Sequence, residues 1–170
     1  MMRFKTLTIS VFALALVAAD SDAIAVSGEY VSGHGALELW DEAARDNVPV
    51  WLRVWLRFLI LTFAAGLFFV RSRKEARWAV GGLVGVIATA TMSQAWTDIV
   101  PLSGFIALLH IVFWSPVLYL LVTRRPFLKD RSLYGAWSGL LTVVILFSFI
   151  FDFRDAAIYL DHVFGLGILS

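Results

Sequence analysis

Residues 102–122 read LSGFIALLHIVFWSPVLYLLV and contain no aspartate, glutamate, lysine or arginine. A helix of this length is about 30 Å long, which matches the hydrocarbon core of a bilayer. Similar apolar segments of about 20 residues occupy 51–70, 78–96 and 133–151. The chain therefore predicts an all-α polytopic membrane protein with a four-transmembrane-helix bundle in residues 51–170.

Composition supports a membrane protein and excludes several other classes. Of the 170 residues, 60% are hydrophobic and 16% are charged. So small a chain cannot bury that much apolar surface in a water-soluble core. A net charge of +1, without a basic run interleaved with aromatic residues, predicts no nucleic-acid partner. The absence of cysteine excludes disulfides, thiolate metal sites and cysteine redox chemistry, and we expect no cofactor and no bound metal.

The first 25 residues have the pattern of a secretory signal peptide. Arg3 and Lys5 precede a short apolar stretch, Thr6–Ala19, and a small-x-small step follows at 23–25. The stretch is short for a spanning helix, so we expect cleavage, with an uncleaved signal anchor as the alternative.

Residues 26–50 form the most water-compatible part of the chain. The apolar residues Leu37, Leu39, Trp40, Ala43 and Ala44 lie among charged ones, which predicts a short amphipathic helix at Ala36–Asp46 on the outer membrane surface. The alternative is an acidic, solvated linker. In either case we expect this segment to be non-cytoplasmic.

The basic residues between the spans predict the orientation of the bundle. They follow the first and third spans: Arg71, Arg73, Lys74 and Arg77, then Arg124, Arg125, Lys129 and Arg131. The loop at 97–101 has no basic residue. Short loops rich in lysine and arginine stay in the cytoplasm. The N- and C-termini of the bundle should therefore be non-cytoplasmic, in a bacterial inner (plasma) membrane. Tryptophans that suit the headgroup level lie near span ends: Trp51, Trp55, Trp78 and Trp96.

Small residues mark the second span. Gly81, Gly82 and Gly85 include a G-x-x-x-G spacing, which lets helix backbones approach closely in lipid. We therefore expect this helix to pack in the centre of the bundle or to form a self-association face.

His110 is the most isolated polar residue of the apolar spans. It lies about eight residues into the third span, with Trp114 one turn further along. Ionisable groups at such depth are functional candidates. One hypothesis is a neutral imidazole bonded to Thr89 or Thr91 of the second span; the other is a cofactor ligand or proton-relay group.

A second polar cluster is predicted at the outer end. Asp152, Asp155, Tyr159 and His162 share one helical stripe, at the membrane level of Arg53 and Arg57. We expect an Arg–Asp ion-pair network that joins the first and fourth helices. The alternative is a ligand or cation site, although the nearby arginines disfavour a cation.

The leading functional prediction is a non-enzymatic accessory or scaffold subunit that acts through helix packing and its outer face. Its partners would be the lipid bilayer and another membrane protein, or a second copy through the second span. The alternative is a membrane-embedded transporter subunit or cofactor-binding protein that uses His110 and the outer Asp/His stripe.

The orientation can be tested with reporter fusions. Fusions at Arg73 and Lys129 should report a cytoplasmic location, and fusions near Asp98 and Ser170 an external one, because the basic loops stay inside. Alkaline phosphatase and fluorescent-protein fusions measure this directly. A cytoplasmic signal at Ser170 would contradict the predicted arrangement.

Overall fold

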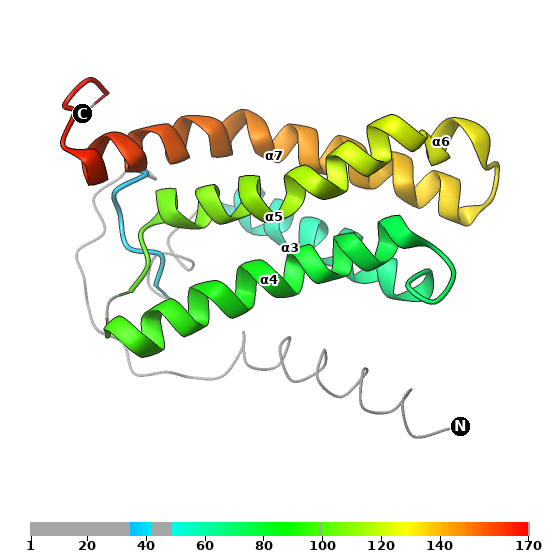
Figure 1. Ribbon diagram of the computed structural model, residues 1–170, viewed down its shortest axis with the longest axis horizontal. Coiled ribbons are helices and arrows are strands. Elements are labelled where there is room, and N and C mark those ends of the chain that lie inside the picture. Colours follow the sequence, from blue (N-terminus) through cyan, green and yellow to red (C-terminus); the bar gives the residue numbers. More distant parts are fainter. Residues whose placement is uncertain (1–34, 42–48, 99, 170) are drawn as a thin grey trace.

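The computed structural model describes residues 35–41, 49–98 and 100–169. Figure 1 shows a bundle of long helices, joined at one end by two short elements. The elements in chain order are α3 (Val50–Ala65), η1 (Gly66–Phe68), α4 (Lys74–Thr97), α5 (Ser103–Arg124), α6 (Pro126–Lys129) and α7 (Leu133–Phe164). Four of the resulting helical segments are long and apolar enough to cross a membrane. The all-α, four-helix prediction is confirmed.

The two connections that carry the basic residues lie at the same end of the bundle, on the right of Figure 1. One runs through η1 into α4, and the other through α6 into α7. Arg125 ends α5 in a left-handed conformation with φ of 52°, and Pro126 then begins α6, where proline suits the first helical position. We call this end of the bundle the basic end.

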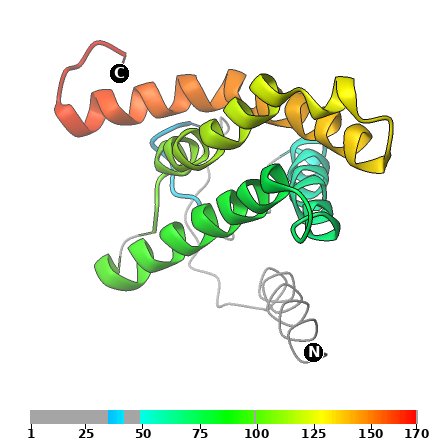
Figure 2. The same cartoon turned by 45° about the vertical axis from the view of Figure 1, so that its right-hand side comes forward.

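Helix α7 is the most deeply packed element. It contains 32 residues and is about 48 Å long. The fraction of buried residues is higher in α7 than in the other three long helices, and it is much lower in α4. Figures 1 and 2 both show α5 between α7 and α4. The Trp137 indole N–H donates to the Thr62 carbonyl at 2.8 Å and joins α7 to α3. The expectation that the glycine-rich helix occupies the centre is therefore wrong.

The glycines of α4 explain its position. A Cβ atom on Gly82 would lie 3.0 Å from the Phe113 carbonyl oxygen, and one on Gly85 would lie within 2.5 Å of the Phe113 ring. A Cβ on Gly81 would meet nothing within 4 Å. The close approach thus joins α4 to α5 within one chain, through Gly82 and Gly85 rather than through the Gly81–Gly85 spacing. The self-association face stays a prediction.

The segment 35–41 differs from the predicted amphipathic helix. Its described residues form a turn and an isolated antiparallel bridge, Leu39–Leu102. The carbonyls of Glu38 and Ala36 accept from the backbone N–H groups of Ser103 and Gly104 at 2.8 and 2.7 Å. The first N–H groups of a helix have no partner within it, and no side chain caps α5, so the extended segment satisfies them instead. Residues 42–46 and the predicted signal segment 1–25 lie outside the described residues.

The predicted interfacial tryptophans occupy two environments. Trp51, Trp78 and Trp96 are exposed near helix ends. Trp55 packs edge-on against Phe147 of α7, with ring centroids 4.6 Å apart.

Two adjacent glycines offer a matched test of the packing between α4 and α5. Gly82→Leu should lower the free energy of unfolding by about 1–3 kcal/mol, because the added side chain meets rigid backbone of α5. Gly81→Leu should have little effect, because its position is open. Reversible unfolding in detergent measures both. Equal losses in the two variants would contradict this packing.

Candidate functional site

A histidine–aspartate pair joins α5 to α7 inside the bundle. His110 Nδ1 lies 3.1 Å from Asp152 Oδ1, and the two side chains are 19% and 13% exposed. His110 is seven residues beyond the start of α5 at Ser103, about 10 Å along the helix. Ionisable side chains at such a level in an apolar segment are costly unless they pair with each other. The pair is thus the main polar contact between these two helices.

Trp114 holds the imidazole in place. The two rings stack with centroids 4.0 Å apart and planes inclined by 10°. Trp114 is itself 1% exposed and packs on Phe63 of α3 at 4.7 Å. The imidazole therefore lies between the indole face on one helix and the Asp152 carboxylate on another.

Further polar atoms near the pair are buried without hydrogen-bond partners among the described residues. They are Asp152 Oδ2, Ser148 Oγ and Trp114 Nε1. Ser148 and Asp152 are one turn apart on α7 and therefore share a face. Most buried polar atoms in proteins are bonded, so these three atoms are exceptions in the described part of the chain.

The predicted threonine partners of His110 are not the ones found. Thr91 is exposed and Thr89 half-buried on α4, while the histidine bonds to α7. The side chain at position 110 points to the α7 side of α5, and the glycines of α4 pack instead around Phe113 and Trp114. The structure thus stacks His110 on Trp114 and pairs it with Asp152 of α7.

The outer Arg–Asp network is not formed. Arg53 and Arg57 are exposed on α3, and Asp152 pairs with His110 while Asp155 lies 3.6 Å from Arg154. The physical reason is the direction of the stripe, which faces α5 rather than α3.

Two contacts show this direction. The Tyr159 ring lies 5.9 Å from Phe105, and a Cβ on Gly104 would lie 2.6 Å from that of Tyr159. His162, at the end of the stripe, is exposed.

The stripe does not assemble a cation site in the described part of the chain. There, no group of three histidine, cysteine, aspartate or glutamate side chains lies close enough to hold a metal ion. The geometry therefore brings together a two-residue acid–base pair, an aromatic stack and buried polar atoms. Comparison of the chain with known protein families, with curated proteins and with solved structures finds no match.

A double-mutant cycle tests the pairing. His110→Ala and Asp152→Ala should show a coupling energy of about 1 kcal/mol, in the range of hydrogen bonds between membrane helices. The cycle of Arg57→Ala with Asp152→Ala should show none. Unfolding of the purified protein in bicelles gives both values. A coupling confined to the arginine cycle would restore the predicted network.

Proposed function

We propose that this chain is a membrane-embedded transporter subunit that binds and releases a proton at the His110–Asp152 pair. The observation that carries the proposal is the 3.1 Å contact between these side chains inside an apolar bundle. The proposal takes up the alternative functional prediction, because the structure supplies His110 with an acidic partner that the sequence did not reveal.

A proton is the ligand that this chemistry suits best. A metal ion needs more ligands than the pair offers, whereas a single basic atom binds a proton and two can share it. The imidazole and carboxylate together exist as a cationic, a neutral and an anionic pair, which differ by one proton each. Among the described residues no hydrogen bond occupies Nε2 of His110, so this nitrogen can exchange a proton while Nδ1 faces Asp152.

Protonation would act on the contact between α5 and α7. In the neutral pair, the two side chains share one hydrogen bond or ion pair that joins the helices. Adding a proton neutralises Asp152 beside an imidazolium, and removing one leaves a carboxylate beside a neutral ring. Each step weakens the attraction across the α5–α7 contact, since one of the two opposite charges is lost. Proton binding is thus linked to helix packing, as a transport step requires.

Location and orientation belong to the same proposal. The protein would lie in a bacterial inner membrane, with the basic end in the cytoplasm and the N- and C-termini of the bundle on the non-cytoplasmic side. Support comes from the two loops rich in arginine and lysine, which lie at one end of the bundle. The pair is then nearer the outer surface than the inner one.

The competing function is the non-enzymatic accessory or scaffold subunit. In a scaffold subunit, the His110–Asp152 pair would only fix the register of α5 against α7, and its protonation would have no role. The two functions differ in what a proton does, so a spectroscopic measurement separates them.

Infrared difference spectroscopy across a pH titration in nanodiscs tests the proton site. Acidification should produce a carboxylic-acid band that disappears in Asp152→Asn and shifts in His110→Gln, because the imidazole no longer shares the proton. Asp155→Asn, on the same stripe, should leave this band unchanged. If the band is the same in Asp152→Asn, the pair does not titrate.

A cellular measurement completes the test. His110→Gln can still donate to Asp152, so stability should change by about 1 kcal/mol, but glutamine cannot exchange a proton. The variant should therefore accumulate in the membrane yet fail to rescue the phenotype of a deletion strain. Normal rescue would support the scaffold function.

A further inference from the structure

The basic end contains a second polar network, built from both basic connections. Arg73 Nη2 donates to Asp130 Oδ2 at 2.8 Å, and its guanidinium lies 4.3 Å from the centre of the Tyr134 ring. The Ser132 hydroxyl and N–H, together with Arg73, hold the pKa of Asp130 below its ordinary value. Asp130 is therefore ionised at neutral pH and occupied by its partners.

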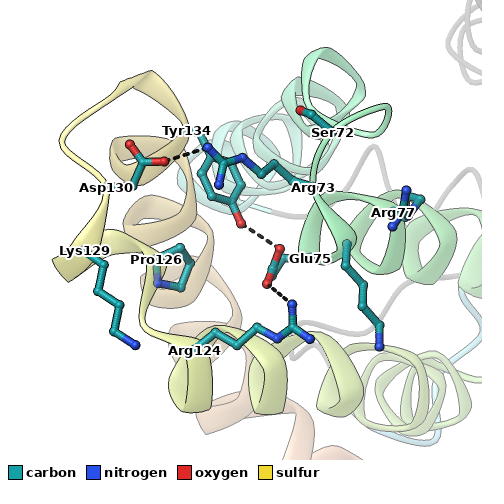
Figure 3. A pocket seen from close by; sticks show the side chains of 10 residues that line it. Ser72, Arg73, Glu75, Arg77, Arg124, Pro126, Lys129, Asp130 and Tyr134 are labelled. Carbon is teal, nitrogen blue, oxygen red and sulfur yellow. Dashed lines mark hydrogen bonds and ion pairs between the residues drawn. The ribbon is translucent and has the colours of Figure 1, made fainter.

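Glu75 is the buried acid of this network. It is 5% exposed and accepts from the Tyr134 hydroxyl at 2.8 Å and from Arg124 Nη1 at 3.1 Å. Figure 3 shows its carboxylate between these two side chains. Both acids of the basic end are thus held by partners from other elements, and neither is free to neutralise a further cation.

A pocket of about 400 Å³ opens beside this network. Its lining residues are Ser72, Arg73, Lys74, Glu75, Arg77, Arg124, Pro126, Lys129, Asp130 and Tyr134. Five of these side chains are basic and two are acidic, which leaves three positive charges. Among the described residues Lys74, Arg77 and Lys129 form no ion pair, and Figure 3 shows Arg77 and Lys129 on opposite sides of Arg124.

We propose that this pocket binds a phosphate-bearing anion, and that the anion is the headgroup of an acidic phospholipid. Lysine and arginine side chains are the groups that recognise phosphate, and the excess positive charge of the lining disfavours a cation. The pocket lies at the ends of helices that can cross a membrane, where lipid headgroups lie. Trp78, Leu128 and Leu133, which are next in sequence to lining residues, are exposed apolar side chains that suit the acyl chains of the same lipid.

Three exposed cations allow a matched test. The variant Lys74→Gln/Arg77→Gln/Lys129→Gln removes the unpaired charges, and Arg53→Gln/Arg57→Gln/Arg154→Gln removes equal charge from exposed residues away from this pocket. Native mass spectrometry of the full chain, titrated with phosphatidylglycerol or phosphatidylcholine, gives the affinities. The wild type and the second variant should prefer phosphatidylglycerol, and the first should bind it roughly tenfold or more weakly, because each lost basic residue contributes to headgroup attraction.

Inorganic phosphate separates the two sources of the anion. Phosphate alone should raise the melting temperature only slightly and should not displace phosphatidylglycerol. If phosphate displaces the lipid and stabilises the protein equally, the ligand is a free anion and the lipid assignment fails. Equal phosphatidylglycerol binding by both triple variants would contradict lipid binding in this pocket. If the triple variant does not fold, the single substitution Lys129→Gln, on an exposed side chain, tests the pocket instead. It should weaken phosphatidylglycerol binding, and unchanged binding would contradict the proposal.

Discussion

Three polar contacts between helices hold this bundle together, and α7 supplies one side of each. Asp152 pairs with His110, Tyr134 donates to Glu75, and the Trp137 indole donates to the backbone of α3. In hydrocarbon an unpaired polar group costs several kcal/mol, so each of these contacts restricts which helix can lie beside α7. This requirement, together with the glycines of α4, determines the arrangement of the four helices.

Hydropathy predicted the four spans because their length and composition are set by the thickness of the bilayer. It could not predict which helices touch. The spacing of Asp152, Asp155 and Tyr159 correctly places them on one half-buried stripe, but periodicity does not say that this stripe faces α5. The predicted fourth span ends at Phe151, one residue before Asp152, so hydropathy assigns this acid to the outer surface rather than to the depth of His110.

Two further features left weaker signals in the sequence. The segment 35–41 binds the start of α5 through its backbone, and such bonds have no compositional pattern. In the sequence, Glu75 is a single acid in a basic loop. In the structure it is buried and accepts two hydrogen bonds. Its only signal is that an acid interrupts a basic run, and assigning it a role required the position of Tyr134, 59 residues away.

The two networks share the same pair of helices, which restricts how that pair can move. α5 carries His110 and Arg124, 14 residues or about 21 Å apart along the helix, and α7 carries Asp152 and Tyr134. Arg124 and Tyr134 both bond Glu75, so the basic end holds α5 and α7 through a common acid of α4. A slide of α5 along α7 would break both networks. A pivot about the basic end would break the His110–Asp152 contact and the packing of Phe105 on Tyr159, but would leave the bonds to Glu75 intact. A change of charge at that pair therefore favours separation of α5 from α7 at the end opposite Glu75.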